Sequence, residues 1–80
     1  MTLTIYTRPG CHLCDEMKAV VRRVLQRRED ISLEEVDISR DAALVERYGT
    51  EIPVLLIDGT KAAKYRVTEE QLTQMLDRRS

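Results

Sequence analysis

The stretch Tyr6-Thr7-Arg8-Pro9-Gly10-Cys11-His12-Leu13-Cys14 decides the fold, because a strand pattern ends in it and a helix pattern begins in it. Residues 2–7 alternate apolar side chains with threonines, which predicts a β-strand. Pro9-Gly10 predicts a turn. After the turn, apolar residues recur at the spacing of an amphipathic helix that reaches about residue 28. The residues of this stripe are Met17, Val20, Val21, Val24 and Leu25. Both cysteines therefore fall at the junction of a strand and a helix.

A second strand and a short helix follow along the chain. Residues 32–38 predict the strand, which a right-handed crossover places parallel to the first. Ser39 is the expected N-cap of the short helix, and Gly49 is expected to end it in a left-handed conformation. Its expected inward-facing residues are Leu44, Val45 and Tyr48.

The last third of the chain predicts a hairpin and a third helix. Residues 53–57 are apolar on both faces, as in a central strand, and Asp58-Gly59 indicates a tight turn to a strand over 61–66. Thr68 and Gln71 have the spacing of a capping box, so a helix begins there. Its expected core residues are Leu72, Met75 and Leu76. The predicted order is βαβαββα, an α/β fold.

Length, composition and charge restrict the class of protein. Eighty residues, 42% of them hydrophobic and 34% charged, predict one globular domain over residues 1–80. A net charge of −1 with no Trp and no Phe argues against nucleic-acid binding. The start of the chain has no signal-peptide pattern, and the longest apolar run, 54–57, is too short to cross a bilayer. We expect a cytoplasmic protein that binds no membrane and is monomeric.

The only cysteines, Cys11 and Cys14, form a C-x-x-C pair, which is typical of redox chemistry when it begins a helix within a βαβ unit. Their spacing brings both sulfurs within bonding reach on the first helical turn. Free N–H groups at the helix start stabilise a thiolate on Cys11, the expected nucleophile. Cys14, one turn further in, is the expected resolving cysteine. Arg8 and a protonated His12 would add positive charge near the nucleophile, although His12 equally fits a solvated surface residue.

The C-x-x-C stretch, followed by Glu51-Ile52-Pro53-Val54-Leu55-Leu56-Ile57-Asp58-Gly59, resembles a glutaredoxin-like protein of the thioredoxin superfamily. The resemblance implies a thioredoxin-like fold, a four-stranded mixed sheet with the first and last helices on one face. It also implies that Pro53 is cis and lies opposite the cysteines, and that the backbone of Ile52 pairs with a bound thiol substrate. The alternative interpretation of Pro53 is an ordinary residue at the start of a strand.

One segment departs from the glutathione-dependent members, which resemble one another in a Gly-Gly pair after the hairpin and an acidic residue at the last helix. Residues 62–68 read Ala-Ala-Lys-Tyr-Arg-Val-Thr here. The resemblance therefore leaves two electron donors open, glutathione or a thioredoxin reductase.

Together these features predict a dithiol–disulfide oxidoreductase with no bound organic cofactor. Its expected partners are a protein or low-molecular-weight disulfide and a reductase or glutathione that supplies electrons. Two alternatives remain at this stage. One is a metal or iron–sulfur cluster held between two chains, since Cys11, His12 and Cys14 offer too few ligands for a closed site. The other is a non-catalytic interaction module.

Overall fold

Four strands form one mixed sheet, in the order β2-β1-β3-β4, in the computed structural model, which describes residues 1–79. The elements follow one another as β1 (Thr2–Thr7), α1 (His12–Leu25), β2 (Ser32–Asp37), the 3-10 turn η1 (Ile38–Arg40), α2 (Ala42–Tyr48), β3 (Val54–Ile57), β4 (Thr60–Lys64) and α3 (Glu69–Arg79). β1 pairs in parallel with β2, while β3 is antiparallel to both β1 and β4. The predicted element order and strand directions are confirmed.

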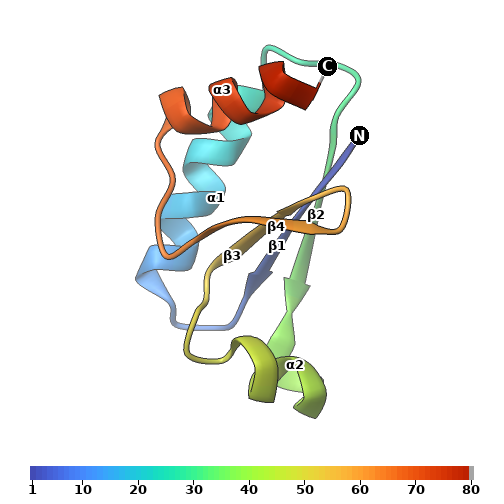
Figure 1. The fold of residues 1–80 in the computed structure, drawn as a ribbon. Coiled ribbons are helices and arrows are strands. Elements are labelled where there is room, and N and C mark those ends of the chain that lie inside the picture. Colours follow the sequence, from blue (N-terminus) through green and yellow to red (C-terminus); the bar gives the residue numbers. More distant parts are fainter. Residues whose placement is uncertain (80) are drawn as a thin grey trace.

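The two faces of the sheet carry cores of different size. α1 and α3 pack together on one side of the sheet, and α2 lies at the far end from α3 (Figure 1). The larger cluster consists of Leu3, Ile5, Met17, Val21, Val24, Leu55, Ile57, Val67, Leu72 and Leu76. The smaller cluster consists of Ile38, Tyr48, Val54 and Leu56. Neighbouring residues of β3 therefore point into different clusters, as expected from the alternation of side chains along a strand.

The predicted N-cap of the short helix is wrong, although the helix ends at Gly49 as predicted. Asp41 caps α2, and its carboxylate accepts the backbone N–H groups of Ala43 and Leu44 at 3.0 and 3.2 Å. Ser39 lies in η1 instead, where it donates to Asp37. Asp41 is the N-cap rather than Ser39 because it lies directly before the helix, where its carboxylate reaches two free N–H groups.

Two residues of the α2 region differ from their predicted roles. Gly49 has a right-handed φ of −56° rather than a left-handed one. The position requires glycine because an added Cβ would overlap the carbonyl oxygen of Val45, which lies close to the Gly49 backbone. Val45 is 39% exposed, not inward-facing, so the small cluster takes only Tyr48 of α2 as a buried residue.

Other boundaries shift by a few residues. α1 ends at Leu25, short of residue 28, because the next turn tightens and Arg27 donates to the carbonyl of Val24. β2 ends at Asp37, which caps η1. β4 covers Thr60–Lys64 and not 61–66.

The hairpin and the start of α3 are as predicted. Asp58 and Gly59 both have positive φ, 48° and 83°, which is the geometry of a two-residue hairpin turn. Thr68 and Gln71 form the capping box: each side chain accepts the backbone N–H of the other residue at 3.0 Å. Met75 is half-buried, and Leu72 and Leu76 are fully buried. α3 is thereby fixed against the larger cluster.

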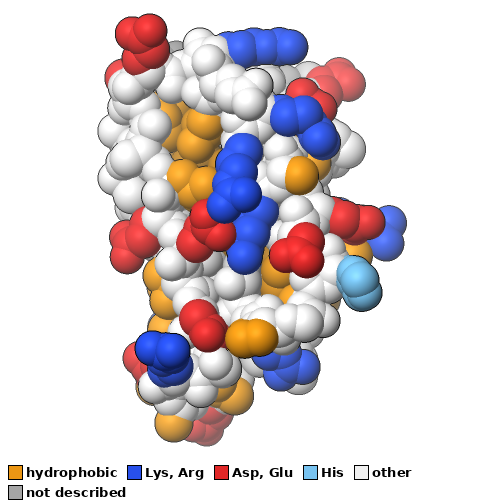
Figure 2. Space-filling view, turned by 180° about the vertical axis from the view of Figure 1, so that it is seen from behind, with side chains coloured by type: hydrophobic (Ala, Val, Ile, Leu, Met, Phe, Trp, Pro, Cys, Tyr) orange, Lys and Arg blue, Asp and Glu red, His pale blue; other side chains and the backbone are white. Residues whose placement is uncertain are grey.

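Charges of both signs intermix over the surface seen from behind (Figure 2). Ion pairs at the protein surface include Arg22 with Glu35 at 2.6 Å and Arg28 with Asp77 at 2.6 Å. The Arg22 guanidinium holds the pKa of the Glu35 carboxyl below its ordinary value. No helix within residues 1–79 is long and apolar enough to span a bilayer.

Candidate functional site

Three chain segments meet at one end of the sheet, where β1 ends, α1 begins and β3 begins (Figure 1). The register fixes this meeting, because Tyr6 near the end of β1 pairs with Val54 at the start of β3. Residues 8–11 lead from β1 into α1, and residues 50–53, which we call the 50–53 loop, lead into β3. All the predicted site residues lie in these segments or in the first turn of α1.

Cys11 is the N-cap of α1. Its backbone is extended, with φ −97° and ψ 108°, and its Sγ accepts the backbone N–H of Cys14 at 3.1 Å. The sulfur thus occupies the place where a capping oxygen satisfies the free N–H groups of a helix. The side chain is half-buried, which leaves part of it open to solvent. A negative sulfur at this position is stabilised by the N–H groups and by the helix dipole.

Cys14 occupies a different environment, although the two cysteines are joined in a disulfide with a Cα–Cα distance of 5.2 Å. Cys14 is 1% exposed and lies on the inner side of the first turn, one turn before Met17 of the larger cluster. A substrate reaching this end of the sheet from solvent therefore meets the sulfur of Cys11 first.

Arg8 and His12 are both exposed. The histidine stands out at the edge of the molecule (Figure 2). Neither side chain forms an ion pair or a side-chain hydrogen bond within residues 1–79. Arg8 lines a small hollow of about 210 Å³ with Pro9, Gly10 and Asp15. The structure thus places both side chains close to Cys11 along the chain but shows no contact between them and the sulfur.

The 50–53 loop presents a free stretch of backbone. The Ile52–Pro53 peptide bond is cis, and Pro53 is buried. Neither the N–H nor the C=O of Ile52 has a hydrogen-bond partner within the described residues. The side chain of Ile52 packs against the smaller cluster, so the loop is anchored on its inner side while this backbone stays unpaired.

β4 tethers the same loop through charges. Lys61 forms an ion pair and hydrogen bond with Glu51, and the Lys64 ammonium lies 3.8 Å from the same carboxylate. The hydrogen bond from Lys61 holds the pKa of the Glu51 carboxyl below its ordinary value of 4.5. Glu51 is therefore charged at neutral pH and bound to the neighbouring strand.

Tyr65, which the sequence analysis did not select, also contacts the 50–53 loop. Its backbone N–H donates to the carbonyl of Pro53 at 2.8 Å, and its hydroxyl donates to the carbonyl of Thr50 at 3.1 Å. Its φ is +68°, the region that favours glycine. The sequence offered one indirect signal, a tyrosine in the segment where the resembling proteins have Gly-Gly.

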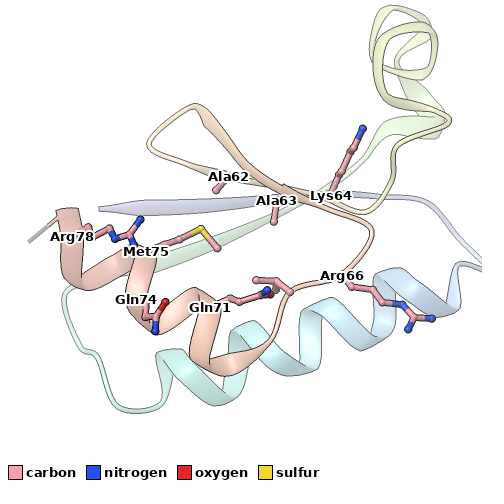
Figure 3. Close-up of a pocket in the computed structure, with 9 residues that line it drawn as sticks. Ala62, Ala63, Lys64, Arg66, Gln71, Gln74, Met75 and Arg78 are labelled. Carbon is pink, nitrogen blue, oxygen red and sulfur yellow. The ribbon is translucent and has the colours of Figure 1, made fainter.

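Larger hollows flank α3, and two of them involve the segment between β4 and α3. A groove of about 480 Å³ runs between α1 and the start of α3, with Glu16, Met17 and Tyr65 among its walls. A second hollow of about 350 Å³ lies between β4 and α3, away from the cysteines, and Met75 and Arg78 line it (Figure 3). Glu16 and Met17 of the first hollow follow Cys14 on α1, but neither cysteine lines either hollow. Within residues 1–79, no cluster of three or more His, Cys, Asp or Glu side chains could hold a metal ion.

The sheet order, the flanking helices and the cysteine pair at the start of α1 define a thioredoxin-like α/β fold. The structure of E. coli glutaredoxin has the same fold, with a TM-score of 0.65 at 19% identity over 99% of this chain and 96% of that one. Residues 2–77 match the family model described as Glutaredoxin-like domain (DUF836). The chain belongs to this family.

Two relatives resemble the chain in sequence as well. The X-ray structure of target protein XcR50 from X. campestris is 32% identical, with a TM-score of 0.77 over 95% of this chain and 96% of that chain. The glutaredoxin-like protein YDR286C homolog of Dictyostelium discoideum is 28% identical over 79 residues, covering 90% of this chain and 71% of the relative. These likenesses, together with the Cys11–Cys14 disulfide, indicate thiol–disulfide redox chemistry.

Proposed function

We propose that this protein is a dithiol–disulfide oxidoreductase in which Cys11 attacks the substrate and Cys14 resolves the intermediate. The asymmetry of the two sulfurs carries the proposal. Cys11 is partly open to solvent and caps the helix, whereas Cys14 is 1% exposed. The nucleophile of such a reaction must be reachable and stabilised as a thiolate, and the second sulfur needs only to reach the first.

The reaction balances as a two-electron exchange. The Cys11 thiolate attacks one sulfur of the substrate disulfide, whose S–S bond breaks, and the departing sulfur leaves as a thiolate that takes a proton from solvent. The Cys14 sulfur, deprotonated as it attacks, then displaces the second substrate sulfur from the mixed disulfide. The products are two substrate thiols and the Cys11–Cys14 disulfide, the bond found in the structure. An external thiol donor returns two electrons to start the next cycle.

The surrounding residues take supporting roles in this proposal. The unpaired N–H and C=O of Ile52 are suited to pair with the backbone of a substrate that carries the disulfide, next to Pro53. Arg8, and His12 in its protonated form, contribute positive charge near the Cys11 thiolate. Because both are exposed, solvent screens their charge and their effect is small.

Substrate and electron donor are proposed as classes. The substrate is a protein or low-molecular-weight disulfide in the cytoplasm, and the protein acts as a monomer without a bound organic cofactor. Donation by glutathione and donation by a thioredoxin reductase are separated by supplying each system alone to the oxidised protein and following the appearance of free thiols.

Single-cysteine variants test the proposal. Cys14→Ser retains the nucleophile but cannot resolve, so it is expected to accumulate a covalent mixed disulfide with an oxidised peptide dimer, detected by intact mass. Cys11→Ser is the matched control, since it keeps one thiol in the same helical turn, and it is expected to form none on the same timescale. Equal adduct formation by both variants would overturn the assigned roles. A wild-type protein that reduces no disulfide would overturn the function itself.

A further inference from the structure

Tyr65 stands at the junction of β4 and α3 in a conformation that needs a cause. Its φ of +68° is sterically unfavourable for any residue with a Cβ, and the ring is 41% exposed, so burial does not compensate. Lys64 and Arg66, its neighbours, point to opposite sides of the chain (Figure 3). Non-glycine residues persist in this region when surrounding contacts hold them there, often at functional sites.

A hydrogen bond from the Arg66 N–H to the Lys64 carbonyl, at 2.8 Å, closes the turn around Tyr65, and Tyr65 itself makes two hydrogen bonds that both end on the 50–53 loop. The backbone N–H reaches the carbonyl of Pro53, and the phenol hydroxyl reaches the carbonyl of Thr50, at 2.8 and 3.1 Å. The bonded carbonyls are the first and last of the 50–53 loop. Between them lies Ile52, whose own N–H and C=O have no partner within residues 1–79. Tyr65 thus holds both ends of the 50–53 loop, while the backbone of Ile52 between them stays unpaired.

From this geometry we infer that Tyr65 is a positioning residue that holds the backbone of Ile52 ready for a substrate with a peptide backbone. The inference rests on the proposed oxidoreductase function and adds a specificity to it. A disulfide within a peptide can pair with Ile52, whereas a small aromatic disulfide has no backbone to offer. The two hydrogen bonds from Tyr65 to the 50–53 loop, which we call the clamp, therefore accelerate exchange with peptide disulfides. They leave exchange with small aromatic disulfides unchanged.

Three variants isolate the clamp. Tyr65→Phe removes only the hydroxyl that reaches Thr50. Tyr65→Gly also removes the ring but retains the backbone N–H and accepts the left-handed φ, so it is expected to fold. Tyr48→Phe is the matched control, because the hydroxyl of Tyr48 has no hydrogen-bond partner within the described residues.

The reduced proteins are mixed with an oxidised peptide dimer or with 5,5′-dithiobis(2-nitrobenzoate), and second-order rates of thiol release are measured. Tyr65→Phe and Tyr65→Gly are expected to slow reduction of the peptide by about threefold to tenfold, the equivalent of one hydrogen bond. Their rates with the aromatic disulfide should match wild type, as should both rates of Tyr48→Phe. Unchanged peptide rates would overturn the inference, and so would an equal loss with both substrates, which would mean that Tyr65 acts on the fold or the thiol.

Amide hydrogen exchange tests the clamp without relying on activity. The N–H of Glu51, which donates to the carbonyl of Tyr48 at 2.8 Å, and the N–H of residue 65, which donates to the carbonyl of Pro53, should exchange faster in Tyr65→Phe than in wild type and Tyr48→Phe, and unchanged exchange would overturn the clamp. Failure of the proposed function is recognised separately, because wild type would then reduce neither substrate.

Discussion

The two faces of the sheet differ in how they hold the halves of the candidate site. The larger cluster packs α1 and α3 against the sheet, and α1 carries both cysteines. The smaller cluster lies on the other face and supports the 50–53 loop through Ile52. That loop is also held by the buried ring of Pro53, by the backbone hydrogen bond from Glu51 to Tyr48, and by surface contacts to Lys61, Lys64 and Tyr65. The sulfurs are therefore positioned by core packing, whereas the adjoining backbone depends on both burial and individual polar contacts.

Leu55 and Leu56 give the sharpest comparison of the two faces, because they are neighbours on β3. Leu55 is fully buried in the larger cluster, and Leu56 is 6% exposed in the smaller one. We expect Leu55→Ala to lower the free energy of unfolding by about 4 kcal/mol and Leu56→Ala by about 2.5 kcal/mol, because the larger cluster leaves the larger cavity. Urea denaturation measures both. Equal losses of unfolding free energy in the two variants would contradict the difference between the larger and the smaller cluster.

Gly49 tests how closely the smaller face is packed at the end of α2. An added methyl group would overlap the carbonyl of Val45, so the chain must shift to admit it. Gly49→Ala is expected to lower the free energy of unfolding by about 2 kcal/mol, within the range for overpacking. Glu46→Ala, at an exposed position of the same helix, serves as the control. A neutral or stabilising effect of Gly49→Ala would show that the backbone at this end of α2 shifts at little cost, and would contradict close packing there.

Glu51 gives the smallest expected effect, and it depends on pH. The hydrogen bond from Lys61 lowers the pKa of Glu51 in the folded protein below its ordinary value of 4.5. Its stabilisation is therefore fully present above pH 4.5 and is lost as the pH falls through the lower folded pKa. The difference in melting temperature between wild type and Glu51→Gln should be small at neutral pH, because the pair is exposed, and should vanish in acid. A difference that grows in acid would contradict the assigned pairing.

Elements with local signals were predictable from the sequence. Alternation marked β1, the stripe from Met17 marked α1, and the Thr68–Gln71 capping box marked α3, because each signal is a spacing that can be read within one short segment of the chain. The C-x-x-C pair also follows from spacing, since the first helical turn brings residues 11 and 14 together.

Features that depend on distant contacts were not predictable from local patterns. Gly49 was expected to adopt a left-handed φ, but its conformation is right-handed. The position requires glycine because there is no space for a Cβ beside the carbonyl of Val45. Asp37, Ser39 and Asp41 are all plausible caps, and the turn of the chain after β2 decides among them. Tyr65 contacts residues 12 and 15 positions earlier, a pairing that no periodicity reveals.

Competitive alkylation of the reduced protein tests the central claim most directly. Iodoacetamide is added at substoichiometric amounts near pH 6, and peptide mass spectrometry compares the label on Cys11 and Cys14. Cys11 is partly exposed and its sulfur faces the free N–H groups of α1, whereas Cys14 is buried. The label should therefore appear on Cys11 well before Cys14. Equal labelling, or faster labelling of Cys14, would contradict the assignment of Cys11 as the nucleophile.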